Sequence, residues 1–303
     1  MIYKSSDLAI IIPSKNYQNI NICLKSIKNQ TKKPGQTIIV FDKKKNFKNS
    51  KKILFSYTKN SNQILQRNHG LNMIDKKIKL ILQLDDKFYL HKRAIEKLIN
   101  EWNNASENVA GVAIKANFKD PSNNKIINFI RFLTLTGSNK PGKVLKSGYN
   151  TQPFSKKRLT DVDWLQGGLS SWKLKHVPNI FNRKFPLNKW SVFEDLIFSY
   201  NVKSQKKLKL VICSGVNAYE IKRSKEEYKV SEYFYRGYEY ARMHKVFLEM
   251  NKNRLSKLAF FYSYFSSLIL NILWCCFGFN KKIFFYIGKI KGIFANTDKI
   301  KVL

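Results

Sequence analysis

The chain has 303 residues and a mass of 35.6 kDa, with 56 Lys and Arg against 20 Asp and Glu, so its formal net charge is +36. Hydrophobic residues make up 44% of the chain, which excludes a disordered polybasic protein. The 4 cysteines form neither a disulfide framework nor a CxxC zinc site, and such sparse usage is typical of a reducing compartment.

The positive charge is carried mainly by lysine, because only 9 of the 56 basic residues are Arg. Nucleic-acid readers use Arg for bidentate contacts to guanine, so this composition argues against specific recognition of nucleic acid. A basic surface still favours anionic partners such as lipid headgroups and sugar nucleotides, and it leaves non-specific nucleic-acid binding as a minor alternative.

Short apolar runs alternate with amphipathic stretches in the first hundred residues. The apolar runs predict buried strands at residues 8–12, 37–41 and 80–84. Helical spacing of apolar residues predicts helices at 19–30, 61–73 and 90–102. This order predicts an α/β fold with a mostly parallel sheet flanked by helices. Ligands of such sheets bind at the carboxyl ends of the strands, here residues 13–16, 42–45 and 85–87.

The remaining sequence changes character twice. Residues 115–157 are rich in Asn, Lys, Gly, Ser and Thr and predict no clear element, whereas residues 208–213 predict a further strand. Residues 1–7 contain no long apolar stretch, so no secretory signal peptide is expected. Residues 222–257 are highly charged and predict a helix, and residues 258–280 follow without a charge. The pattern predicts two parts, residues 1–222 and a helical region at 223–303.

The uncharged segment is long enough to cross a membrane, and Lys281 and Lys282 follow it. Its basic flanks and aromatic residues favour membrane contact, with a buried helix of a soluble domain as the alternative. Whether the segment spans the membrane or lies in its plane stays open at this point.

Adjacent carboxylates give the sharpest chemical signal. Asp85 and Asp86 directly follow a predicted strand and repel each other unless a cation or hydrogen bonds compensate. A hard divalent ion that bridges carboxylate and phosphate oxygens would do so, and a turn with helix-capping acids is the alternative. Asp42 also follows a strand, where it can accept hydrogen bonds from a base or a ribose or simply cap a helix.

An acidic pair and a glycine pair later in the chain are further candidate site residues. Glu194 and Asp195 precede an amphipathic helix, where the helix dipole alone would favour acids. Gly167 and Gly168 permit a close approach of the backbone to a ligand, or form a plain turn. The flanking Trp164 and Trp172 would stack on sugar rings or pack in the core.

Several motifs, in this order, resemble glycosyltransferase family 2, whose catalytic domain has the GT-A fold. The resemblance covers roughly residues 7–215. The motifs are AIIIPSKN at 9–16, LKSIKNQT at 24–31, IIVFD at 38–42, QRNHGL at 66–71, LQLDD at 82–86, the glycine pair and the Glu-Asp pair.

On the donor side, the resemblance implies a nucleotide site. Asp42 would contact the base, and Asp85 would meet the ribose. The other nucleotide-binding residues that it implies are Pro13, Ser14, Lys15 and Arg67.

The resemblance also implies a metal ion, Mg2+ or Mn2+, on Asp86. Many family members carry a third acid where this chain has Lys87. On the acceptor side, it implies that Asp195 is the general base, that Glu194 orients it or holds the acceptor, and that Gly167 and Gly168 approach the sugars.

The resemblance therefore predicts an inverting enzyme that moves a sugar from a nucleoside-diphosphate donor to a hydroxyl of a glycan or lipid-linked acceptor. The apolar tail suggests work on surface polysaccharide at the cytoplasmic face of the membrane, with a peripheral attachment or a single C-terminal span. The alternative is an inactive membrane-associated protein of the same fold that binds nucleotide sugars or glycans, and Lys87 is its main argument.

Overall fold

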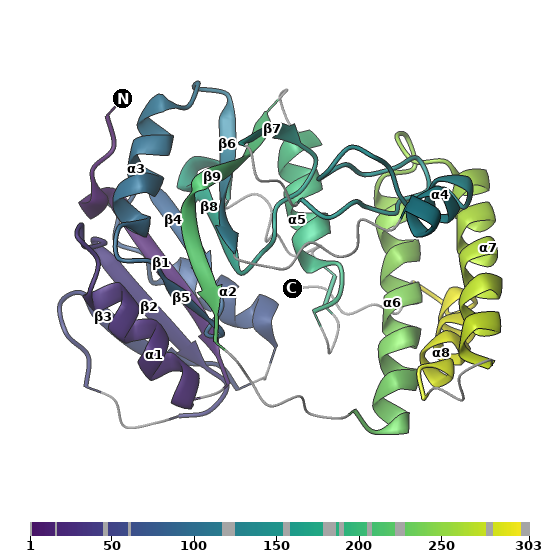
Figure 1. Cartoon of the computed structure of the whole chain (residues 1–303). Helices are drawn as coiled ribbons and strands as arrows, with labels where there is room; N and C mark the ends of the chain where they lie inside the picture. The colour runs from purple at the N-terminus through teal and green to yellow at the C-terminus, as the bar shows by residue number, and fades with distance from the viewer. Residues whose placement is uncertain are drawn as a thin grey trace.

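The structure is a computed structural model of the whole chain (Figure 1). It describes residues 2–15, 17–44, 48–59, 62–116, 125–153, 158–177, 186–187, 191–204, 208–221, 228–276 and 281–297. Asn16 and Lys45 in the predicted ligand-binding turns, and residues 222–227 and 277–280 of the predicted C-terminal segments, lie outside the described residues.

The first half of the sheet is parallel, as the sequence predicts. Its strands lie in the order β3-β2-β1-β4, with bounds Leu8–Ser14 (β1), Gln36–Phe41 (β2), Ile53–Tyr57 (β3) and Leu80–Leu84 (β4). Every residue of β1, β2 and β4 is buried, which explains their continuous apolar character. The sequence did not predict β3, whose residues are only partly buried.

The predicted helices of this half are confirmed with small shifts of their ends. They are α1 (Tyr17–Lys28), α2 (Gln63–Asn72) and α3 (Ala94–Asn104). The shift is largest for α3, because the first residue of its predicted range, Leu90, ends the short strand β5 (Phe88–Leu90) and a turn at 91–93 precedes the helix.

The second half of the sheet is mixed. Its remaining strands are β6 (Val109–Ala116), β7 (Leu159–Val162), β8 (Leu169–Lys173) and β9 (Lys209–Glu220). Strand β8 lies antiparallel between β4 and β6, β9 is parallel to β6, and both β5 and β7 run antiparallel to β9. Four of the eight strand pairings in the described part are therefore antiparallel. The α/β class is confirmed, with more antiparallel pairing than expected.

Trp164 and Trp172 belong to the core. Trp172 is fully buried beneath the ring of Phe198, and Trp164 donates its indole N–H to the carbonyl of Thr151 at 2.9 Å. Of the two alternatives for these tryptophans, the structure supports packing in the core and not stacking on sugar rings.

The remaining elements of the described chain are helices (Figure 1). They are η1 (Ser5–Asp7), α4 (Lys125–Leu133), η2 (Leu174–His176), α5 (Glu194–Ser204), α6 (Val230–Met250), α7 (Lys257–Cys276) and α8 (Ile283–Ile293). Helices α6 and α8 approach closely at glycines, since a Cβ on Gly237 would overlap the carbonyl of Phe285 and one on Gly288 that of Phe234. Helix α7 is tied to α8 by the hydroxyl of Tyr264, which donates to the carbonyl of Lys289 at 2.6 Å.

Candidate active site

The carboxyl edge of the sheet gathers most of the predicted residues. Ser14 ends β1, Asp42 follows β2, and Asp85 and Asp86 follow β4. Strand β8 is antiparallel to β4, so its start, directly after the glycine pair, lies at the same edge. The sheet topology alone therefore brings these segments together.

Ser14 and Asp86 are joined directly. The Ser14 hydroxyl donates to Asp86 Oδ2 at 2.8 Å, and both residues are buried. Ser14, expected to line the nucleotide pocket, therefore also holds the carboxylate expected to bind a metal. Pro13 beside it is buried as well, whereas Lys15 is exposed.

Gln66 on α2 fixes the ends of the two neighbouring strands. Its side-chain amide donates to the carbonyl of Ser14 at 3.2 Å and to that of Val40 at 3.0 Å. Because the Gln66 side chain is buried, these bonds fix the spacing between the ends of β1 and β2. Sequence analysis assigned Gln66 no role of its own, and a polar residue on the buried side of a helix was the only available signal.

Arg67, also on α2, lies at the centre of three carboxylates. Its Nη2 atom is 2.9 Å from Asp85 Oδ1, and its Nη1 atom bonds Glu194 and lies 3.5 Å from Asp195 Oδ1. The Arg67 side chain is only 2% exposed. The guanidinium of Arg67 is thus engaged by acids in this structure, and the expectation that it also faces the nucleotide stays a prediction.

The cluster carries an excess of negative charge. One guanidinium faces Asp85, Glu194 and Asp195, with Asp86 next in sequence. Burial alone lowers the pKa of Arg67, but the surrounding carboxylates outweigh it and raise that pKa, so Arg67 stays charged. Burial raises the pKa of Glu194 and of Asp195 above their ordinary values, and the charge of Arg67 opposes both shifts.

Exposure separates the two acids that begin α5. The Glu194 side chain is 3% exposed and that of Asp195 is 38% exposed. This burial fits a role for Glu194 in orienting its neighbour, and the expected contact of Glu194 with an acceptor stays a prediction. Asp195 has an open side toward solvent, which a group that touches a substrate requires.

The glycine pair makes room for carboxylates. A Cβ on Gly167 would overlap the Asp195 carboxylate, and one on Gly168 would overlap that of Asp85. Asp195 also accepts a hydrogen bond from the Gly167 N–H, and Asp85 N–H donates to the Gly168 carbonyl at 3.0 Å. The sequence predicted a close approach at these glycines, and in the structure the approaching groups are the site's own acids.

Asp85 is held from several sides. Gln63 donates to Asp85 Oδ1 at 2.7 Å, as does Arg67, and Lys87 Nζ lies 4.0 Å from Asp85 Oδ2. Its carboxylate is thus oriented before any ligand arrives, while its side chain keeps 20% exposure.

Phe193 sets the start of α5 through a strained backbone. Its φ angle is +64°, a left-handed conformation that is uncommon for a bulky residue. Its ring packs on α6, with ring centroids 5.0 Å from both Tyr240 and His244. Helix α6 therefore supports the residue directly before the two acids, a relationship that no sequence pattern predicted.

Comparison with known proteins agrees with this arrangement. Residues 9–152 match the sequence model of the family described as Glycosyl transferase family 2. The chain carries a glycosyl transferase family 2 domain. The predicted resemblance is confirmed, and this domain supports a glycosyltransferase.

Two solved structures share the fold of this glycosyltransferase. A mannosyltransferase from Pyrobaculum calidifontis, in complex with GDP-Man and Mn2+, is 12% identical with a TM-score of 0.53, over 97% of this chain and 88% of that one. Residues 1–349 of TarS from S. aureus are 13% identical with a TM-score of 0.50, over 89% and 72% of the two chains. A search of curated protein sequences finds no match.

The residues of the glycosyltransferase site are compatible with a divalent cation for which Asp86 would be the protein ligand and the donor would supply further ligands. Within the described ranges, no group of three or more His, Cys, Asp or Glu side chains forms a closed metal cage. Mg2+ is commonly held by one or two carboxylates together with substrate phosphates, so the single carboxylate of Asp86 is a ligand of the usual type for this ion. The excess of acid around Arg67 favours a cation at this edge.

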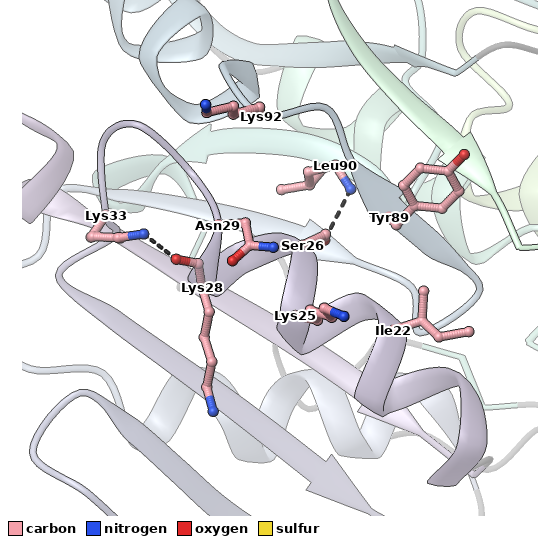
Figure 2. A pocket seen from close by; sticks show the side chains of 9 residues that line it. All are labelled: Ile22, Lys25, Ser26, Lys28, Asn29, Lys33, Tyr89, Leu90 and Lys92. Carbon is pink, nitrogen blue, oxygen red and sulfur yellow. Dashed lines mark hydrogen bonds between the residues drawn. The ribbon is translucent and has the colours of Figure 1, made fainter.

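A separate hollow lies between α1 on one side and β5 with its connection to α3 on the other (Figure 2). It has a volume of about 680 Å³, and none of the four site acids lines it. Its lining includes Lys25, Lys28, Lys33 and Lys92, and the Ser26 hydroxyl on its wall accepts the Leu90 N–H at 3.0 Å. Its lining contains no carboxylate, so this hollow offers neither a carboxylate general base nor a carboxylate ligand for a metal ion.

Proposed function

We propose that this chain transfers a sugar from a nucleoside-diphosphate donor to an acceptor hydroxyl in a single in-line displacement that inverts the anomeric centre. The observation that supports it is the contrast between Glu194 and Asp195. Only Asp195 is open to a substrate, and its pKa is raised toward the range useful to a general base.

Asp195 would take the proton of the acceptor hydroxyl as the new bond forms. Arg67 and the Gly167 N–H hold this carboxylate in place, and Glu194 holds Arg67 from the buried side. Preorganised contacts of this kind reduce the reorganisation that proton transfer requires.

The donor would lie along the ends of β1, β2 and β4. Asp42 would accept hydrogen bonds from the base, with Pro13, Ser14 and Lys15 beside it, and Asp85 would meet the ribose. Lys15 is exposed at this edge, so its ammonium can approach a phosphate.

Asp86 would hold Mg2+ or Mn2+. A divalent cation there supplies positive charge against the leaving diphosphate. Lys87, which stands where the family resemblance implies a third acid, adds a positive charge 4.0 Å from Asp85 and would leave fewer protein ligands for the ion. The neighbour that binds GDP-Man with Mn2+ makes that pair the first donor and ion to test.

The acceptor would be a glycan or a lipid-linked sugar, in the synthesis of surface polysaccharide. Residues 1–222 would form the catalytic domain, and residues 223–303 would associate with the cytoplasmic face of the membrane. Support comes from α7, which is the one described helix long and apolar enough to cross a membrane.

A binding titration tests the donor half of this proposal. Nucleoside diphosphates and their sugars should bind the full chain more tightly with Mn2+ than without it, and Asp86→Asn should remove that difference. Asp75→Asn, at an acid whose side chain is 48% exposed in a surface turn, is the control and should bind normally. Binding that ignores both Mn2+ and Asp86 would contradict the metal assignment.

The second candidate is an inactive binding protein of the same fold, favoured by the contact of Lys87 with Asp85. It predicts donor binding without any release of nucleoside diphosphate in the presence of acceptor. Transfer of sugar to a hydroxyl by the purified protein would exclude it.

A further inference from the structure

Helix α4 leaves its apolar side chains outside the protein core. Six of its nine residues are apolar, and none of the nine is buried. Phe129 and Phe132 are 61% and 62% exposed. A helix this short is not stable in water by itself, and a contiguous apolar patch marks an interaction surface.

Helix α7 lies beside α4 and continues the patch (Figure 1). The Tyr262 hydroxyl of α7 donates to the carbonyl of Leu133 at the end of α4, at 3.1 Å. Only 28% of the most apolar stretch of α7 is buried. Its exposed apolar side chains include Leu258, Phe261, Phe265, Ile269, Leu273 and Trp274. We call the exposed apolar side chains of α4 and α7 the apolar face.

The segments that carry the apolar face contain no acid. Residues 125–150 contain five Lys and Arg, residues 250–297 contain seven, and neither range contains Asp or Glu. Lys125 and Arg131 on α4 and Lys257 at the start of α7 are exposed. An apolar surface flanked by basic groups complements an anionic lipid bilayer, whose headgroups attract the lysines while its acyl region accepts the apolar groups.

The packing of α7 decides against a span across the membrane. Its inner side is tied to α8 by Tyr264 and to α6 by the contact of Phe260 with His244, whose ring centroids are 4.8 Å apart. Helix α6 carries the ion pair of Glu239 with Arg242. A spanning α7 would carry these charges into the hydrocarbon or break the contacts, and either is costly.

We infer that the apolar face seats the enzyme on an anionic bilayer surface, with α4 and α7 lying in the plane of the interface. This rests on the membrane association proposed above and adds an attachment point within the family 2 domain, because α4 lies inside the matched residues 9–152. The C-terminal helices and the catalytic domain then share one membrane surface, which fits a lipid-linked acceptor.

Vesicle flotation of the full chain tests the inference. The wild type should bind phosphatidylcholine vesicles containing phosphatidylglycerol more tightly than vesicles of phosphatidylcholine alone. F129S/F132S should lower the partition coefficient by about tenfold or more, because two exposed apolar groups are lost. The control I2S/I22S removes exposed apolar groups from the opposite end of the molecule. It should change the partition coefficient by less than about twofold, which is well below the effect of burying one apolar side chain.

The other outcomes have distinct meanings. Binding of F129S/F132S at the wild-type level would overturn the role of α4. A lipid-independent dimer that F129S/F132S dissociates would overturn the inference in favour of a second copy of the chain on the apolar face. Failure of the wild type to bind any vesicle, with Mn2+-dependent binding of donor intact, would overturn the membrane surface and leave the transfer proposal standing.

The orientation of α7 has its own measurement. Lys257→Cys, at the start of α7, and Lys282→Cys, directly before α8, flank α7 in the sequence. Both should react with an impermeant maleimide added outside vesicles to which the protein is bound. Cys23, Cys213 and Cys275 are buried, and Cys276 is replaced by serine in all the proteins compared, so the C276S parent gives the background. Protection of one end only would mean that α7 spans the bilayer and would overturn the in-plane arrangement.

Discussion

Arg67 donates a buried hydrogen bond to Glu194, joining α2 to the start of α5 across 127 positions of sequence. The same guanidinium contacts Asp85 after β4. One side chain therefore links the donor side of the site to the acids expected on the acceptor side.

Replacing Arg67 by lysine tests that dependence. Lysine keeps the charge but lacks the planar fork that reaches two carboxylates at once. We expect Arg67→Lys to lower kcat by about 10- to 100-fold, because Asp195 loses its fixed orientation. Steady-state kinetics with Arg93→Lys, at the exposed Arg93–Glu96 pair of α3, provide the matched comparison. Equal kinetics in the two variants would show that Arg67 only supports folding.

The glycine pair should tolerate no side chain. Gly167→Ala and Gly168→Ala place a methyl group on the carboxylates of Asp195 and Asp85, and we expect each to cost about 1–3 kcal/mol of stability and to reduce transfer sharply. Gly215→Ala is the control, since a Cβ there meets nothing within 4 Å. Thermal unfolding and transfer assays on the three variants decide the point. Normal activity in Gly167→Ala would place Asp195 outside the reaction.

Ser14→Ala tests how Asp86 is held. Loss of the 2.8 Å hydrogen bond should cost about 1 kcal/mol and loosen the Asp86 carboxylate. We expect weaker binding of Mn2+ with donor, by roughly 5- to 10-fold, and little change in kcat at saturation. Ser106→Ala at an exposed turn should bind normally in the same titration. An unchanged Mn2+ requirement in Ser14→Ala would separate Ser14 from the ion.

His244 should make the protein sensitive to acid. Burial lowers its pKa to about 3 from an ordinary 6.5, and the nearby charge of Lys289 adds to this. A lowered histidine pKa stabilises the fold above pH 6.5, and that stability is lost as the pH falls toward 3, by a total on the order of 2–5 kcal/mol.

Denaturant unfolding at pH 7 and pH 4.5 checks this expectation. The free energy of unfolding should fall less between the two values for His244→Phe than for the wild type. His91→Phe, at an exposed position, should show the wild-type fall. The same fall in all three proteins would contradict a buried neutral His244.

The strands at residues 8–12, 37–41 and 80–84 were predictable because both faces of each are covered, which leaves an apolar signal at every position. The antiparallel strands β5, β7 and β8 were not, because they are short and partly polar. Helix α4 escaped prediction because its apolar pattern lies in a polar region, and none of its residues reaches the core.

The sequence located the acids of the site but not their connection. Asp85, Asp86, Glu194 and Asp195 stand out as adjacent carboxylates at the ends of predicted elements. Arg67 was expected only to bind the nucleotide, because the carboxylates that surround it lie up to 128 positions away in the sequence. Only the tertiary structure shows which face of α2 turns toward them.

The most direct test of the account compares donor binding with single-turnover transfer in Asp195→Asn. The asparagine keeps the size of the side chain and removes its ability to take a proton. We predict donor binding within about twofold of the wild type and transfer slowed by about 10²- to 10⁴-fold, the usual contribution of a general base. Transfer at the wild-type rate with donor binding intact would contradict the assignment of Asp195 and the mechanism built on it.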